Sequence, residues 1–259
     1  SWRWCEGNPY SDSIYVAIYD TLGNLVNGPL GLQMQLPNSS LIDTLSNETP
    51  GLCLFPPSPP NVCVEQAIYE GFWFLPSFDP GGYHITFQQC CRNGTIDNID
   101  LWNGQAGTSL FVTKPPDNIA SCNSSVQYDQ YPPTTICMDD TFIYEHSAFD
   151  PDGDSIVYAL CSATDGDFTD PSTGSFNAHL APSKFIDTFF DVGYTGTGYA
   201  YSATDPIYAP NLPLTIDPHT GILTCLPEQE GQYLITVCAY EYRNGELLSV
   251  NKRDFTFNV

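Results

Sequence analysis

The chain has 259 residues, a length that suggests two domains of roughly 100 to 150 residues each. It carries 30 acidic residues against 7 Lys and Arg, for a formal net charge of −23. The chain has no basic stripe that could neutralise phosphate groups, so nucleic acid and anionic membranes are poor partners. Such an excess of carboxylates is most easily tolerated beside salt, glycan or divalent cations, so calcium is the first cofactor to consider.

Aromatic and turn-forming residues are abundant, with 16 Tyr, 15 Phe, 22 Pro and 20 Gly, a profile that favours strands joined by turns. The ten cysteines are irregularly spaced and lack paired CxxC motifs, which indicates disulfides formed in an oxidising compartment rather than structural zinc. No apolar run approaches the roughly 18 to 20 residues of a membrane span, so direct membrane insertion is not expected. The first residues lack signal-peptide features, and we interpret the sequence as a mature chain or an excerpt.

Runs of β-branched and aromatic residues predict four strands in the first half. They cover residues 13–19, 67–75, 83–89 and 109–113. Between Cys53 and Cys63 the segment carries four prolines, so it cannot be a central strand and is predicted to be a loop. A Cys53–Cys63 disulfide would staple this loop.

Turn-rich sequence between Lys114 and Pro133 predicts a domain boundary near residue 117, which divides the chain into residues 1–117 and 118–259. The second half has its own set of predicted strands. They cover residues 141–144, 155–160, 212–216, 222–225, 232–242 and 247–259. A long loop insertion is predicted at residues 162–210, and Gly221 is expected to close a turn that begins at Asp217. Long helical periodicity is absent, so the fold class is all-β with a β-sandwich in each half.

Three segments occur in an order that carries a family likeness, namely residues 150–158, 214–224 and 231–237. They resemble the cadherin-like and immunoglobulin-like modules of bacterial surface proteins. Further likeness at residues 83–94, 241–245 and 253–259 is to large secreted proteins of the Bacteroidota, often labelled gliding-motility or PKD-domain proteins. The resemblance covers nearly the whole chain except the insertion. It implies two tandem immunoglobulin-like or cadherin-like β-sandwich domains, the first lacking its first strand.

The resemblance also implies export, by the type IX secretion route, to the bacterial cell surface. The expected function is a non-catalytic structural or adhesive module that serves adhesion, gliding or a filament. Its expected partners are neighbouring domains of a longer surface protein, with a glycan or a cell-surface protein as further candidates. Two alternatives stay open: a carbohydrate-binding accessory region of a secreted polysaccharide-degrading enzyme, and a self-assembling filament subunit.

Three aspartates alternate along one short segment: Asp150, Asp152 and Asp154. Because Gly153 permits a sharp turn, their carboxylates can converge on one hard cation at about 2.3 to 2.6 Å, the distance that calcium prefers. Asp139 and Asp140 are candidates to complete the shell. The segment lacks the final Glu and the flanking helices of an EF-hand. The alternative interpretation is that these Asp and Gly residues are simply turn formers.

A second disulfide is predicted between Cys161 and Cys238, joining two strands as an inter-sheet pin. Vicinal Cys90 and Cys91 on a strand would point to opposite faces and take different partners. Each predicted half holds five cysteines, so either one disulfide crosses the boundary or some thiols stay free. Cys122 is the candidate for a crossing disulfide.

The insertion carries four tyrosines that are predicted to form a partner surface, because long loops on rigid scaffolds often bind. They are Tyr194, Tyr199, Tyr201 and Tyr208. Asp followed by Ser or Thr and an aliphatic residue resembles an O-glycan acceptor of the Bacteroidota. The matching positions are Ser13, Thr21, Thr44 and Ser155. The four histidines stand far apart and form no metal or nucleophile motif, so catalysis is not expected.

Overall fold

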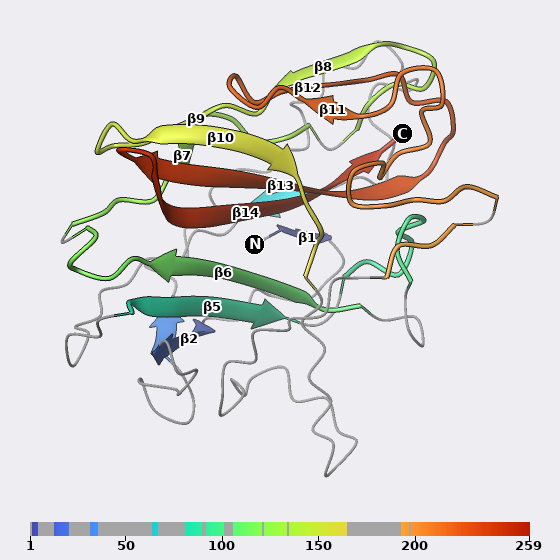
Figure 1. Cartoon of the computed structure of the whole chain (residues 1–259). Helices are drawn as coiled ribbons and strands as arrows, with labels where there is room; N and C mark the ends of the chain where they lie inside the picture. The colour runs from blue at the N-terminus through green and yellow to red at the C-terminus, as the bar shows by residue number, and fades with distance from the viewer. Residues whose placement is uncertain are drawn as a thin grey trace.

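The computed structural model of the chain describes residues 2–4, 13–20, 32–35, 64–66, 81–89, 92–100, 106–120, 122–133, 135–164, 193–196 and 198–259. Within these residues the fold is all-β, with no helix, and the strands form antiparallel sheets (Figure 1). The predicted fold class is therefore confirmed at this level. No helix in the described ranges is long and apolar enough to cross a membrane.

The first half forms a four-stranded sheet in the order β3-β2-β5-β6. Its strands are β2 (Ser13–Asp20), β3 (Leu32–Gln35), β5 (Tyr83–Gln89) and β6 (Thr108–Lys114). A two-stranded ladder also joins β1 (Trp2–Trp4) to β4 (Val64–Gln66). The strand predicted at residues 67–75 lies outside the described residues.

The second half forms a sheet in the order β10-β13-β14, a second sheet in the order β11-β12-β8 and the short ladder β7-β9. The first two contain β10 (Ser155–Leu160), β13 (Gln232–Arg243), β14 (Glu246–Asn258), β11 (Thr215–Ile216), β12 (Ile222–Cys225) and β8 (Phe142–Glu145). The ladder joins β7 (Gln127–Tyr128) to β9 (Ala148–Phe149).

The predicted turn between β11 and β12 is present. The carboxylate of Asp217 accepts hydrogen bonds from the backbone N–H groups of His219 at 2.9 Å and Thr220 at 2.7 Å. Gly221 closes the turn with a φ of +73°, and a Cβ there would lie only 2.9 Å from the His146 carbonyl oxygen. Glycine therefore supplies both the left-handed conformation and the close approach to the neighbouring chain.

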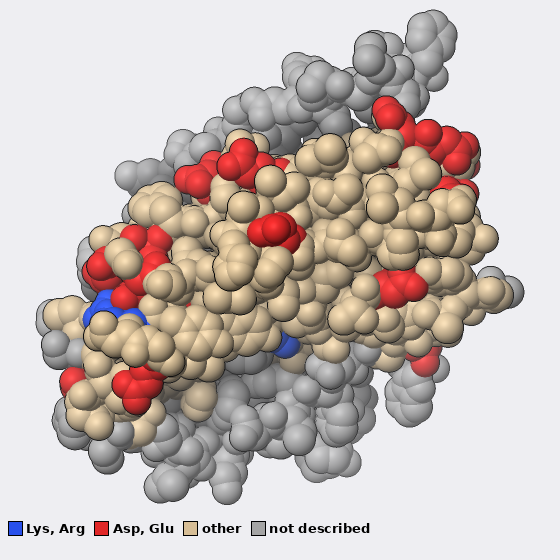
Figure 2. Space-filling view, turned by 45° about the horizontal axis from the view of Figure 1, so that its top comes forward, with Lys and Arg blue, Asp and Glu red and all other residues tan. Residues whose placement is uncertain are grey.

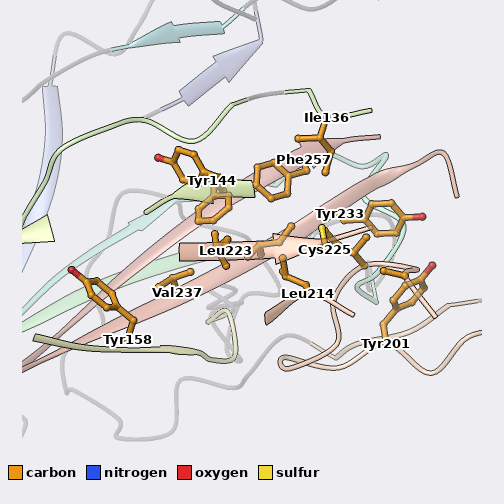
Figure 3. Close-up of a cluster of buried hydrophobic side chains, with 14 of the residues drawn as sticks. Ile136, Tyr144, Tyr158, Tyr201, Leu214, Leu223, Cys225, Tyr233, Val237 and Phe257 are labelled. Atoms are coloured by element: carbon orange, nitrogen blue, oxygen red, sulfur yellow. The ribbon is translucent and has the colours of Figure 1, made fainter. Parts of the chain in front are cut away.

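β13 is the central strand of the molecule because it is buried on both faces. Side chains alternate between the faces of a strand, so Tyr233, Ile235 and Val237 share one side. This side packs against Leu223 and Tyr144 of the other sheet, and all five side chains belong to one buried cluster. Figure 3 shows Tyr144, Leu223, Tyr233 and Val237 in this cluster between the strands. In Figure 1 the sheet containing β8 and β12 lies above β10 and β13, with the core between them.

The opposite face of β13 is covered by residues from the first half. Leu234 is 1% exposed and packs with Ile96 and Ile99. Between them, the buried side-chain amide of Asn98 accepts a hydrogen bond from the Leu234 N–H at 2.9 Å and donates one to the Leu234 carbonyl at 2.9 Å. Because β10 ends at Leu160, opposite Val237, Asn98 takes the place of a strand neighbour for Leu234.

A buried ion pair also joins the two halves. Arg92 Nη2 lies 2.6 Å from Asp254 Oδ2, with side chains only 6% and 8% exposed. Arg92 also donates to the carbonyl oxygens of Gly107 and Thr164. β6 and β14 lie side by side (Figure 1). These contacts cross the predicted boundary near residue 117, so the two halves pack against each other, while the boundary itself stays a prediction.

The predicted insertion at residues 162–210 is more closely integrated than expected. Residues 165–192 lie outside the described part of the chain. Beyond them, Ile207 and Ala209 are fully buried and belong to the main core. The Asn98 side chain fixes this segment by donating a hydrogen bond to the Pro206 carbonyl oxygen at 2.8 Å. Residues 198–210 are therefore part of the packed body rather than a projecting loop.

Candidate cation site

The aspartate loop connects β9 to β10, and Asp150 sets its conformation. Asp150 Oδ1 accepts hydrogen bonds from the backbone N–H groups of Asp152 at 2.8 Å and Asp154 at 3.2 Å. The Asp150 carbonyl accepts a third from Gly153 N–H at 3.1 Å, and Gly153 has a φ of +84°. This is the turn chemistry that Asp and Gly favour. Asp150 Oδ2, in contrast, is buried without a hydrogen-bond partner among the described residues.

The three aspartate carboxylates converge as the sequence predicts. One oxygen from each of Asp150, Asp152 and Asp154 lies within 4.8 Å of the others. Ligands on opposite sides of a calcium ion are separated by about 4.6 to 5.2 Å, twice the calcium–oxygen distance, so the residues fit this ion. Asp139 and Asp140 do not join the cluster. They precede β8, whereas the aspartate loop follows β9, and their part in completing the shell stays a prediction.

An arginine already contacts these carboxylates. Arg243, the last residue of β13, donates from Nε to Asp154 Oδ1 at 2.7 Å and from Nη2 to Asp154 Oδ2 at 2.6 Å. The same Nη2 lies 3.4 Å from Asp152 Oδ2. The hydrogen bonds from Arg243 are the main reason that the pKa of Asp154 is lowered. Two-pronged pairing of this kind is the strongest geometry available to an Arg and a carboxylate.

The same guanidinium also holds a neighbouring segment of chain. Arg243 Nη1 donates to the Cys122 carbonyl oxygen at 3.2 Å, and Nη2 lies 3.2 Å from Asn123 Oδ1. The next residue, Ser124, donates its backbone N–H to Asp152 Oδ2 at 2.6 Å. Residues 122–124 are therefore linked to the aspartate loop through both Arg243 and Asp152.

A fourth carboxylate, that of Glu241, is close enough to the loop for the charges of Asp150 and Asp154 to act on it. Glu241 is on the core face of β13, in the row that begins with Tyr233, and it is fully buried. Its Oε2 accepts a hydrogen bond from Ser249 Oγ at 2.7 Å, while Oε1 has no partner among the described residues. Burial raises the pKa of Glu241, and the charges of Asp150 and Asp154 raise it further.

Sequence reasoning missed both Glu241 and Arg243. The sequence does contain a signal for Glu241. The odd-numbered positions of this strand, from Tyr233 onward, are apolar and face the core, and Glu241 is the first charged residue in that row. A charged residue in register with a buried face is a candidate for a buried polar site. The assembled cluster places four carboxylates beside one guanidinium. Figure 2 shows acidic groups spread over one face of the molecule, one of them bordering a basic patch.

The cysteines follow the predictions in part. Cys161 and Cys238 form a disulfide, as predicted. Its role as an inter-sheet pin is wrong, because Cys161 directly follows β10 and Cys238 lies in β13, the adjacent strand of the same sheet. Cys122 is a free thiol and so provides no crossing disulfide. The residues of the predicted Cys53–Cys63 disulfide lie outside the described part of the chain, as do Cys5, Cys90 and Cys91.

The two free thiols among the described residues should differ sharply in reactivity. Cys122 is exposed, whereas Cys225 is buried in the core and burial raises its pKa to about 12. Since the thiolate is the reactive form, iodoacetamide is expected to label Cys122 in the folded protein and Cys225 only after unfolding. Peptide mass mapping locates the label. Equal labelling of both residues in the native protein would contradict this arrangement.

The tyrosines of the predicted partner surface pack inward. Tyr201 is only 9% exposed and belongs to the main core. Tyr199 lies 4.9 Å from both Tyr201 and Tyr208, measured between ring centroids, and its hydroxyl donates to Asp205 Oδ2 at 2.6 Å. Tyr194 packs against the core as well. The core takes up much of the apolar surface of these four rings, and their role as a partner surface stays a prediction.

The remaining predicted positions are dispersed. Ser155 is exposed at the start of β10 and Ser13 lies at the start of β2, while Thr21 and Thr44 fall outside the described residues. The described histidines lie on separate elements. His146 is 1% exposed, and burial lowers its pKa to about 3, so it is uncharged at neutral pH.

Comparison with protein-family models, with curated proteins and with solved structures gave no match to this chain, so the description of the cation site rests on the geometry given above.

Proposed function

We propose that this chain is an extracellular, non-catalytic structural or adhesive module of a bacterial surface protein, built from immunoglobulin-like or cadherin-like β-sandwiches. The observation that carries the proposal is the Cys161–Cys238 disulfide, which ties the end of β10 to the central strand β13. Disulfides of this kind form and persist in oxidising compartments. This bond joins residues that are 77 positions apart in the sequence. Closing so long a loop lowers the conformational entropy of the unfolded chain and thereby stabilises the folded state.

The packing around β13 suits such a role. β13 is covered on both faces, and its neighbour β14 is joined to the first half by the buried Arg92–Asp254 ion pair, so this sheet resists local opening. The net charge of −23 keeps such modules apart in solution and favours contact with cations. Both properties fit a stalk or a spacer in a longer surface protein.

The location can be tested on intact cells that make the protein. Brief treatment with a protease that cannot enter cells should release peptides of this chain, while a cytoplasmic marker stays intact. Recovery of the peptides only after lysis would contradict the proposal. A glycan array then distinguishes a structural or adhesive module from a carbohydrate-binding accessory region. Tight and specific glycan binding by the isolated chain would favour the carbohydrate-binding region.

We also propose that Asp150, Asp152 and Asp154 bind calcium. Their oxygens lie within 4.8 Å of one another. One guanidinium offsets only part of the charge of the surrounding carboxylates, and a divalent cation would neutralise more of it. The hard oxygen ligands of the cluster match the preference of calcium.

Calcium is therefore expected to raise the melting temperature saturably. A ligand that binds only the folded state stabilises it by about 2.7 kcal/mol at one hundred times its Kd. Asp152→Asn should remove most of this rise, because it removes one ligand charge and keeps an oxygen for the Ser124 N–H. The matched control is Asp140→Asn, which removes the same charge outside the cluster. Coinciding thermal melts in EDTA and in millimolar calcium would show that the aspartates are turn formers only.

A further inference from the structure

Arg243 occupies the carboxylate oxygens that a cation would need. Both oxygens of Asp154 accept hydrogen bonds from its guanidinium, and one oxygen of Asp152 lies 3.4 Å from it. A metal ion that used these oxygens would sit beside the positive charge of the guanidinium. Calcium and the guanidinium in its present position are therefore competitors for the same ligands.

A second observation, independent of the aspartate loop, points to a cation. Glu241 is fully buried and its Oε1 has no partner among the described residues. Burial and the charges of Asp150 and Asp154 raise the pKa of Glu241, and the effect of these charges places its carboxyl near the aspartate loop. The buried Oε1 of Glu241 and Oδ2 of Asp150 are both unsatisfied. Buried carboxylate oxygens without donors are costly, and a cation that both side chains could reach would satisfy them.

We propose that a divalent cation and the Arg243 guanidinium exchange at this cluster, and that Glu241 becomes the fourth carboxylate ligand once the guanidinium has moved away. This inference rests on the proposed calcium site and adds a ligand and a resident competitor to it.

The positions of the two side chains make the exchange possible. Arg243 is 29% exposed and precedes the turn at Asn244 and Gly245, so its side chain can swing into solvent without disturbing the core. Glu241 is held by Ser249 and stays in place. Movement of Arg243 would also break its contact with the Cys122 carbonyl oxygen and loosen the segment that follows. Cation binding thereby changes the surface at residues 122–124.

Calorimetric titration of the purified chain with calcium chloride tests the exchange. Arg243→Gln removes the competing charge and should tighten calcium binding by about tenfold or more, since a unit charge a few ångströms away acts strongly. Glu241→Gln can still accept the Ser249 hydrogen bond, and it should weaken binding by about tenfold because a ligand charge is lost. The charge-matched controls are Lys114→Gln and Glu230→Gln, which lie outside the cluster and should stay within about twofold of the wild type.

The outcomes separate this inference from the calcium site itself. Calcium affinities of the wild type and of Arg243→Gln that agree within about twofold leave the site standing and overturn the exchange. Absence of binding in both proteins overturns the calcium site as well. Unchanged binding in a folded Glu241→Gln variant removes Glu241 from the ligand set. Circular dichroism of each variant in EDTA establishes that it is folded.

Discussion

Arg92→Met is expected to lower the free energy of unfolding by about 3 to 5 kcal/mol, because it leaves the buried carboxylate of Asp254 without its partner. The variant also loses the hydrogen bonds from Arg92 to Gly107 and Thr164. The measurement is urea denaturation followed by circular dichroism. Tryptophan fluorescence follows the first half separately, because all four tryptophans lie before residue 117.

Two further variants show whether the ion pair is responsible. Lys114→Met breaks a more exposed pair with Asp117 and should cost at most about 1 kcal/mol. Arg92→Met combined with Asp254→Leu should recover much of the loss, since replacing both members of a buried pair is often tolerated. A single Arg92 variant as stable as the Lys114 variant contradicts the prediction.

Asn98→Ala is expected to destabilise the protein by about 3 kcal/mol or more, because each buried polar group left without a partner costs about 1 to 3 kcal/mol. The substitution removes partners from three backbone groups, namely the Leu234 N–H, the Leu234 carbonyl and the Pro206 carbonyl. Hydrogen exchange measured by mass spectrometry should show faster exchange in peptides that contain Leu234. Asn93→Ala, at a half-buried position nearby, is the control and should have a much smaller effect. Unchanged exchange at Leu234 contradicts the role of Asn98 as a substitute for a strand.

The longer strands could be predicted because their signals are local. Residues 83–89, 155–160 and 222–225 alternate or cluster apolar side chains between turn residues, and the structure has strands over these ranges. The two-residue strands β7 and β9 were missed, because so short a run has no measurable period.

Only the part of the candidate site whose residues are close together in the sequence could be predicted. Asp150, Asp152 and Asp154 are neighbours in sequence, so their convergence follows from turn chemistry. Arg243 is 89 residues away from Asp154 in the sequence. The two residues are brought together only by the pairing of β10 with β13. The burial of Tyr201 is likewise a result of tertiary packing, which an aromatic composition alone does not reveal.

The Cys161–Cys238 disulfide has a mechanical consequence for a module that bears tension. Pulling on the two ends of the chain cannot extend the segment between these cysteines, which spans 77 residues. At roughly 3.4 Å per residue, the bond withholds about 260 Å of contour length from a stretched chain. Once the module has unfolded under load, a reducing agent would return this length, so the unfolded chain would be a shorter tether when oxidised than when reduced.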